Sequence, residues 1–137
     1  MDNEQKVEMM AEKKIWAVIG ATPDPKKISN QIYHTFKDYG YEVYGVNPKY
    51  EEMDDGSKIY SRLEDLPKTP EAVDFVVPPG VTMEHLQGMD PKIYPNIWLQ
   101  PGTYNDDIVK YAEEKGFTAV HEGACVMAYI RINKRVK

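Results

Sequence analysis

The chain has 137 residues, of which 42% are hydrophobic and 28% charged, and a formal net charge of −5. This composition is typical of a soluble globular domain, and the acidic balance argues against nucleic acid or an anionic membrane surface as a partner. The single cysteine, Cys125, excludes an internal disulfide framework and a cysteine-based zinc site, and no other metal site is indicated. No segment approaches the length of a membrane span, and the N-terminus lacks the apolar core of a signal peptide, so we expect a cytoplasmic protein without a membrane partner.

The N-terminal segment has apolar residues at helical spacing, namely Val7, Met10 and Ala11. This spacing predicts a short helix. We expect residues 1–13 to form an arm and residues 14–137 to form one globular domain. No internal repeat and no shift in composition marks a second domain.

Short apolar segments along the rest of the chain predict five strands. They are residues 15–19, 41–46, 72–77, 96–99 and 118–122. The first is apolar throughout and ends at Gly20, as is typical of a strand covered on both faces. Residues 59–60 are expected to form a short extended piece and residues 62–67 a helical turn, while residues 123–137 receive no assigned element.

Helical segments separate the predicted strands. Ser29 is expected to cap a helix that stops at Gly40, Thr82 to cap a short helix, and Asn105 to cap a helix that ends before Gly116. Strands that alternate with helices predict an α/β fold, which we expect to be Rossmann-like: an open parallel five-stranded sheet with helices on both faces, in three layers αβα. Such a sheet binds ligands beyond the carboxyl ends of its strands.

The loop after the first strand, "GATPDPKKIS", has the composition of an anion cradle. Gly20 permits a tight turn, Thr22 offers a hydroxyl, and Ser29 lies with the free amides at the start of the following helix. Lys26 and Lys27 add positive charge in an acidic chain. An ordinary strand-to-helix connection is the alternative, but such loops commonly have about 2–6 residues. By itself the loop indicates an anion without identifying it.

A dinucleotide such as NAD fits this loop poorly. The fingerprint G-x-G-x-x-G would need glycines where Thr22 and Pro25 stand. The acidic residue that normally binds the ribose at the end of the second strand is replaced by Asn47, and Lys49 follows it. These two residues suit a phosphorylated ribose better than a plain one.

Two further strand ends carry rigid turns. Pro78 has no amide hydrogen and ends its strand, and Pro79 and Gly80 then form a turn whose apolar wall could hold a flat ring or an aliphatic chain. A simple strand terminator explains these residues equally well. Gln100 offers amide donors and an acceptor at the next strand end, and Pro101 repeats the rigid turn.

The ordered motifs resemble the small CoA-binding proteins of bacteria and archaea, stand-alone relatives of the N-terminal CoA-binding domain of succinyl-CoA synthetase α subunits and ADP-forming acyl-CoA synthetases. The motifs are "VIGATPDPKKIS", "GYEVYGVNPK", "YSRLEDLP", "VDFVVPP", "WLQPG" and "CVMAYIRI". The resemblance covers residues 14–133 and implies a Rossmann-like domain that binds coenzyme A across its strand ends.

The resemblance also implies which residues contact coenzyme A. Those near the phosphates would be Gly20, Ala21, Thr22, Lys26, Lys27 and Ser29. Those along the adenosine and its 3′-phosphate would be Asn47, Pro48 and Lys49. Val77, Pro78 and Pro79 would flank the nucleotide or the start of the pantetheine arm, whose path Gln100 and Pro101 would line. The chain departs from the family pattern at residues 83–95 and 121–125, so contacts from these segments stay open.

No catalytic arrangement is evident among the candidate residues. His34 is interpreted as structural, His85 could face the ligand, and His121 stands beside Glu122 without a Ser/His/Asp pattern. Cys125 is either a buried small hydrophobe or, if it lies near the pantetheine end, a residue that forms a mixed disulfide with coenzyme A.

The sequence therefore predicts a protein that binds coenzyme A or acyl-CoA as a sensor, carrier or accessory subunit, without catalysis of its own. A homodimer or a protein partner is left open. The alternatives are an NAD(P)-binding oxidoreductase or redox-sensor domain, and a structural protein that kept the fold and lost the ligand.

Overall fold

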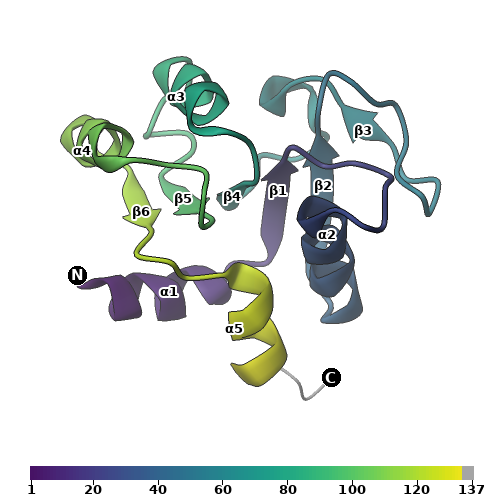
Figure 1. Ribbon diagram of the computed structural model, residues 1–137, viewed down its shortest axis with the longest axis horizontal. Coiled ribbons are helices and arrows are strands. Elements are labelled where there is room, and N and C mark those ends of the chain that lie inside the picture. Colours follow the sequence, from purple (N-terminus) through teal and green to yellow (C-terminus); the bar gives the residue numbers. More distant parts are fainter. Residues whose placement is uncertain (134–137) are drawn as a thin grey trace.

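The computed structural model describes residues 1–133 (Figure 1). In chain order the elements are α1 (Asn3–Ala11), β1 (Ile15–Ile19), α2 (Ile28–Asp38), β2 (Glu42–Val46), β3 (Ile59–Tyr60), the 3-10 turn η1 (Leu63–Asp65), β4 (Ala72–Phe75), α3 (Pro79–Gln87), β5 (Asn96–Leu99), α4 (Asp106–Lys115), β6 (Thr118–Val120) and α5 (Val126–Asn133).

The strands of the described residues form one parallel sheet in the order β3-β2-β1-β4-β5-β6. The α/β architecture with a parallel sheet is confirmed, but the predicted number of five strands is wrong, because the sheet has six. The additional strand is Ile59–Tyr60, which pairs with Gly45 and Val46 at the edge. The sequence showed only a short extended piece there because two residues are too few to display a periodicity.

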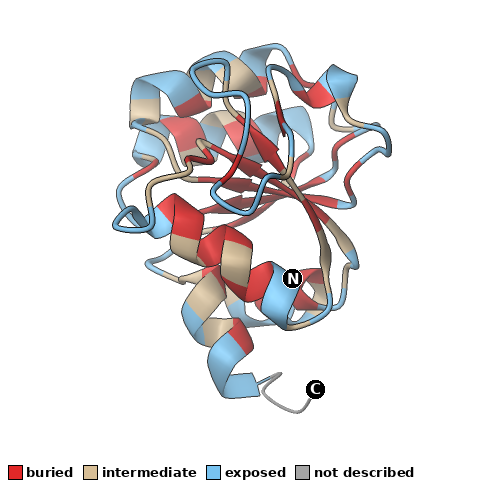
Figure 2. Ribbon diagram, turned by 90° about the vertical axis from the view of Figure 1, so that its right-hand side faces the viewer, coloured by how far each residue is buried: buried red, intermediate tan, exposed pale blue. Residues whose placement is uncertain are grey.

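Helices cover both faces of the sheet and give the expected three layers (Figures 1 and 2). α1, α2 and α5 pack on one face, where Trp16 lies between Phe36 and Trp98 with ring-centroid distances of 4.6 and 6.2 Å. α3 and α4 pack on the other face around Phe75 and Leu99. Because both faces of the sheet are buried, β1 is apolar throughout, as the sequence indicated.

Two helices begin earlier than predicted. Ser29 lies inside the first turn of α2, whose N-cap is the extended residue Lys27, so its assignment as N-cap was wrong. Thr82 likewise lies inside α3, which begins at Pro79 after the N-cap Pro78. Proline is well suited to the first helical position because its φ is already helical and its missing N–H would have no partner there.

The N-terminal helix is packed into the fold and covers the outer edge of the sheet. Met10 is fully buried. Asn3 exchanges two hydrogen bonds with the backbone of His121, and Nζ of Lys6 donates to the carbonyl of Ala119 at 3.3 Å. α1 thereby occupies polar backbone groups beside β6 that an uncovered edge strand would present to other chains.

The acidic partner of the His121 ring is Glu113 of α4, at 3.7 Å.

Within residues 1–133, no helix combines the length and the apolar character that crossing a membrane requires.

Candidate functional site

The candidate site lies where the chain leaves neighbouring strands toward opposite faces of the sheet. β1 and β4 are adjacent and parallel, but β1 leads to α2 on one face and β4 leads to α3 on the other. This reversal opens a crevice at the carboxyl ends of the two strands, the usual ligand position in open α/β sheets. A pocket with a volume of about 710 Å³ lies there.

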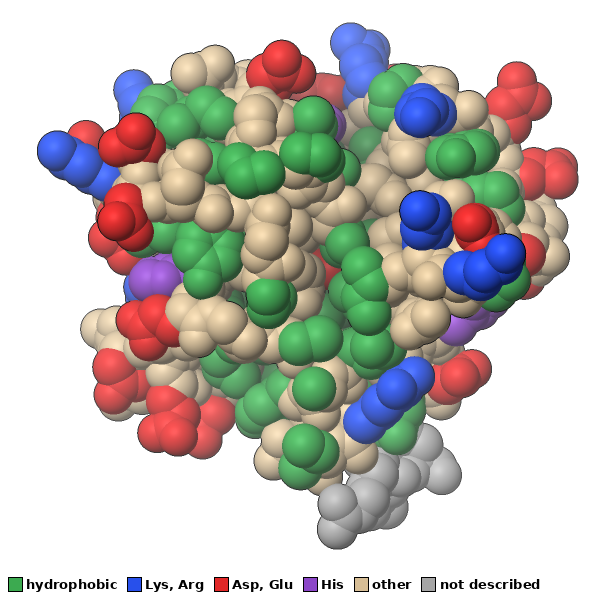
Figure 3. Space-filling model, in the orientation of Figure 1, with side chains coloured by type: hydrophobic (Ala, Val, Ile, Leu, Met, Phe, Trp, Pro, Cys, Tyr) green, Lys and Arg blue, Asp and Glu red, His purple; other side chains and the backbone are tan. Residues whose placement is uncertain are grey.

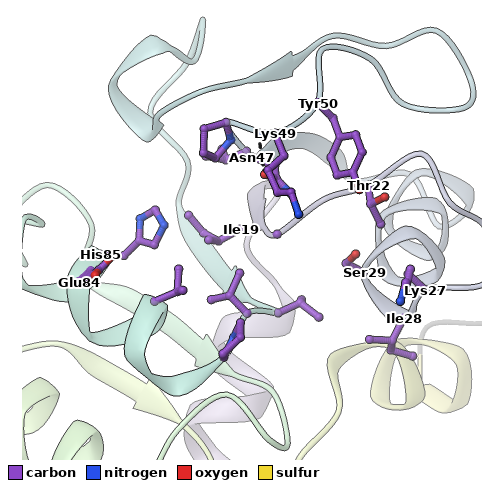
Figure 4. A pocket seen from close by; sticks show the side chains of 17 residues that line it. Ile19, Thr22, Lys27, Ile28, Ser29, Asn47, Lys49, Tyr50, Glu84 and His85 are labelled. Atoms are coloured by element: carbon purple, nitrogen blue, oxygen red, sulfur yellow. Dashed lines mark hydrogen bonds between the residues drawn. The ribbon is translucent and has the colours of Figure 1, made fainter.

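The pocket brings together residues from three of the four predicted loops (Figure 4). The predicted residues that line it are Gly20, Thr22, Lys27, Ser29, Asn47, Pro48, Lys49, Val77 and Pro78. The other lining residues are Ile19, Ile28, Val46, Tyr50, Val76, Val81, Glu84 and His85.

Gly20 lines the pocket in a conformation that requires glycine. Its φ is +97°, and a Cβ at this position would lie 2.4 Å from the carbonyl oxygen of Val76 and 2.8 Å from Cγ1 of Val77. Its N–H donates to the carbonyl of Val46 at 2.9 Å. The ends of β1, β2 and β4 therefore meet through direct backbone contact at this residue.

The start of α2 offers unpaired donors to the pocket. Lys27 is its N-cap and forms no side-chain cap, whereas Asp2 and Asn105 cap α1 and α4. The first turn of α2 contains no acidic residue, and Ser29 lies in it. Since the first amides of a helix have no partner within it and carry the positive end of its dipole, this end favours an anion.

Two lysines approach the pocket from different elements. Figure 4 shows Lys49 directed into the pocket from the loop after β2, and Lys27 beside Ser29 at the start of α2. In Figure 3, Lys and Arg side chains gather over the side of α2 and β2, and acidic side chains gather over the side of α4. The pocket therefore has a positive wall in a chain whose net charge is −5.

The side chain of Asn47 connects two loops of the site. Its Nδ2 donates to the carbonyl of Ala21 at 2.9 Å, and its Oδ1 accepts from the amide of Lys49 at 2.9 Å. The side chain thus joins the loop after β1 to the loop after β2. A contact between Asn47 and the ligand stays a prediction.

The remaining walls are apolar or carry α3 side chains. Ile19, Val46 and Val77 form an apolar surface that suits a flat ring or an aliphatic chain. On the side opposite α2, Figure 4 shows Glu84 and His85 projecting from α3.

The surroundings of His85 favour its neutral form. Burial lowers its pKa, and the charges of Glu84 and Glu64 oppose this effect only in part. Its ring lies 6.1 Å from that of Phe75, edge to face. A neutral imidazole offers a ligand one donor and one acceptor.

The other predicted residues lie outside the pocket lining: Ala21, Lys26, Pro79, Gln100 and Pro101. Gln100 is buried and bonded to Asp74 and to the amide of Val126, at the start of α5. Cys125 is partly exposed and precedes α5. Their contacts with a ligand, and the mixed disulfide at Cys125, stay predictions.

The sequence analysis missed several pocket residues, among them Val81 and Glu84 of α3, whereas it had named His85 as a residue that could face the ligand. Val81, Glu84 and His85 stand at positions i, i+3 and i+4 of α3 and so share one helix face. Starting that helix at Pro79 instead of Thr82 would have placed all three on one face in advance. For Ile28 and Tyr50, no pattern in the sequence indicated a place in the pocket.

Among the residues that the structure describes, no group of three or more His, Cys, Asp or Glu side chains could hold a metal ion.

The fold and the pocket define the protein as a Rossmann-like α/β domain with a pocket at the carboxyl edge of its sheet. Its sequence matches the family model described as CoA binding domain over residues 14–130, and the chain belongs to that family.

Relatives include both small proteins and larger enzymes. The Bacillus subtilis protein YneT is 29% identical over 117 residues, which are 82% of this chain and 83% of YneT. A hypothetical protein from Pyrococcus horikoshii superposes with a TM-score of 0.84 at 35% identity and covers 96% of this chain and 92% of that one. The Pyrococcus furiosus protein "Acetate--CoA ligase [ADP-forming] II subunit alpha" is 40% identical over 63 residues, which are 45% of this chain but only 14% of that subunit.

Proposed function

We propose that this protein binds coenzyme A or an acyl-CoA in the pocket between β1 and β4. The observation that carries the proposal is the convergence, in one pocket, of an uncapped helix start and two lysines from different loops beside an apolar wall. Membership in the CoA binding domain family names the ligand class that combines these chemistries.

The phosphates of the ligand would lie at the start of α2. There the amides of its first turn, the Ser29 hydroxyl and Lys27 provide donors and positive charge. Lys49, on the neighbouring loop, would meet the 3′-phosphate of the adenosine. The apolar surface that includes Val77 and Pro78 would hold the adenine ring or the beginning of the pantetheine arm.

The protein would act as a binding protein, sensor, carrier or accessory subunit rather than as a complete acyl-CoA synthetase. The acetate–CoA ligase subunit that it matches shares only 14% of its own length with this chain. Its ligase activity therefore belongs to a much larger polypeptide. A partner protein or a second copy of the chain would supply any further chemistry.

An NAD(P)-binding function is less well supported. The pocket carries neither the second and third glycines of the dinucleotide fingerprint nor an acidic residue at the end of β2, where Asn47 binds the backbone instead.

Thermal unfolding with coenzyme A, acetyl-CoA, dephospho-CoA, NAD and NADP tests the proposal. A ligand present at about 100 times its dissociation constant stabilises the folded state by about 2.7 kcal/mol. We expect coenzyme A and acetyl-CoA to raise Tm most, dephospho-CoA less, and NAD least. Stabilisation by NAD or NADP with no response to any CoA species would reject the proposal.

A further inference from the structure

Asn30, a buried residue of α2, connects the pocket loop to a distant loop. Only 2% of its surface is exposed. Its Nδ2 donates to the carbonyl of Thr22 at 3.0 Å and to Oδ1 of Asp54 at 2.9 Å. Thr22 lines the pocket, whereas Asp54 belongs to the loop between β2 and β3.

The surroundings fix the orientation of this side chain. A carboxamide nitrogen has two hydrogens, and both are used here, on two oxygens that can only accept. Turning the amide over would place Oδ1 of Asn30 against the Thr22 carbonyl and the Asp54 carboxylate, and both hydrogen bonds would become repulsions. The Thr22 carbonyl and the Asp54 carboxylate therefore together fix the orientation of the Asn30 amide.

Asp54 is itself held by α2. Its Oδ1 also lies 2.9 Å from Nε2 of His34, one helical turn beyond Asn30. These hydrogen bonds, that from His34 first, lower the pKa of Asp54 and keep it ionised and accepting. Asp54 and Asn30 thus form a small clasp between α2, the β2–β3 loop and the pocket loop.

A second clasp on the same loop does not reach the pocket. Asp55 accepts from Nζ of Lys37 at 2.7 Å and from the amide of Ser57 at 2.9 Å. Burial raises the pKa of Asp55, but the bonds from Lys37 and Ser57 outweigh this and bring it to about 2. Asp55 therefore provides a matched control: it ties the same loop to the same helix without touching Thr22.

The two carboxamides act on successive peptide groups of the pocket loop. Asn47 holds the carbonyl of Ala21, and Asn30 holds the carbonyl of Thr22. In a trans peptide the carbonyl and the following N–H point in opposite directions. Because the Ala21 carbonyl points toward Asn47, the N–H of Thr22 in the same peptide group points away from Asn47. The hydrogen bond from Asn30 to the Thr22 carbonyl keeps the following peptide group, Thr22–Pro23, from rotating.

We propose that Asn30 and Asp54 are positioning residues: by holding the Thr22 carbonyl, next to the Ala21 carbonyl held by Asn47, they keep the pocket loop in the conformation that receives the ligand's phosphates. The inference rests on the proposed function. It assigns to the exposed Asp54 an effect on phosphate binding although Asp54 does not line the pocket.

The test compares Asp54→Ala, Asp54→Asn and the control Asp55→Ala by calorimetric titration with coenzyme A and by thermal unfolding. We expect Asp54→Ala to weaken coenzyme A binding about fivefold, the effect of one lost hydrogen bond. Asp54→Asn keeps an oxygen for Asn30 and should bind within about twofold of the wild type. Asp55→Ala should lower Tm at least as much as Asp54→Ala but leave affinity unchanged.

A ligand-free measurement separates this inference from the proposed function. The backbone amide resonances of Ala21 and Thr22 should shift in Asp54→Ala and stay in place in Asp55→Ala. Equal affinities for the two alanine variants, or unshifted Ala21 and Thr22 resonances in Asp54→Ala, would overturn the positioning function. If the wild-type protein shows no binding of coenzyme A in the titration, both the proposed function and the assignment to phosphate binding are overturned, whatever the resonances show.

Discussion

Gln100 donates a hydrogen bond from Nε2 to Oδ1 of Asp74 in the middle of the sheet. Asp74 is fully buried, and its other oxygen, Oδ2, has no hydrogen-bond partner within the described part of the chain. Burial raises the pKa of Asp74 to about 8, against the opposing hydrogen bond from Gln100. The carboxyl group is therefore protonated at neutral pH in the folded protein, and Gln100 supplies its hydrogen bond.

The first prediction concerns Asp74→Asn. In the unfolded chain the Asp74 carboxyl ionises near its ordinary pKa of about 4, whereas in the folded protein it keeps its proton up to about pH 8. The unfolded state thus binds fewer protons between these values. The free energy of unfolding should therefore fall as pH rises through this window, by up to about 1.4 kcal/mol per pH unit.

Asparagine has the shape of the protonated acid and cannot ionise, so Asp74→Asn should remove this slope. Denaturant unfolding at several pH values measures it: the variant should gain stability over the wild type steadily from about pH 4 to about pH 8. At the acidic end, where Asp74 is neutral in both states, the two proteins should differ least. Parallel stability curves would contradict the buried, protonated Asp74.

The second prediction uses the adjacent lysines Lys26 and Lys27. Lys27 lines the pocket and Lys26 does not, although both were expected near the phosphates. Lys27→Glu should weaken coenzyme A binding by at least about tenfold, as expected for the loss of a charged contact to phosphate. Lys26→Glu changes the net charge equally, so it controls for long-range attraction and should have a much smaller effect. Calorimetric titration with coenzyme A compares the two, and equal losses would show that only the overall field matters.

The third prediction concerns Lys49, which is directed into the pocket from the loop after β2. Lys49→Glu should weaken coenzyme A more than dephospho-CoA, because only the former carries the 3′-phosphate. The measurement is the ratio of the two dissociation constants in wild type and variant. An unchanged ratio would place the 3′-phosphate elsewhere in the pocket.

The fourth prediction tests the close contact at Gly20. Gly20→Ala adds strain at a φ of +97° and a clash with the Val76 carbonyl. We expect it to lower the free energy of unfolding by about 2 kcal/mol or more. Gly116→Ala is the matched control, since Gly116 has a φ of +103° but open space around its Cα. It should show the backbone strain alone, so a larger loss of stability at Gly116 than at Gly20 would refute the close contact.

Much of the fold followed from local patterns. Residues 15–19 and 96–99 were predicted with the bounds of β1 and β5, and the Asn105 cap of α4 is present. Apolar runs and a capping residue act within a few positions, so the sequence displays them. The edge strand β3 depends on its pairing with β2, which the local pattern does not show, and it was missed. The start of α3 was placed at Thr82 although Pro79 is a local signal for the first helical position.

The sequence predicted the parts of the site that depend on backbone geometry better than the hydrogen-bond partners of its side chains. Gly20 and the start of α2 follow from the strand–loop–helix order, and they line the pocket. Asn47 and Gln100 have side chains whose type suits a ligand, yet both bind groups of the protein itself. The sequence shows that a side chain is an amide but not which groups of the protein it bonds, because those neighbours are distant in the chain.

The contact at Gly20 also bears on how this site can diversify. Because β1 and β4 meet there through main-chain atoms, the depth of the pocket is set without any side chain between them. Residues at its mouth, such as Ile28, Tyr50 and Val81, are exposed and project from separate elements. Substitutions among them can change the side chains that a ligand meets while the backbone contact at Gly20 stays in place.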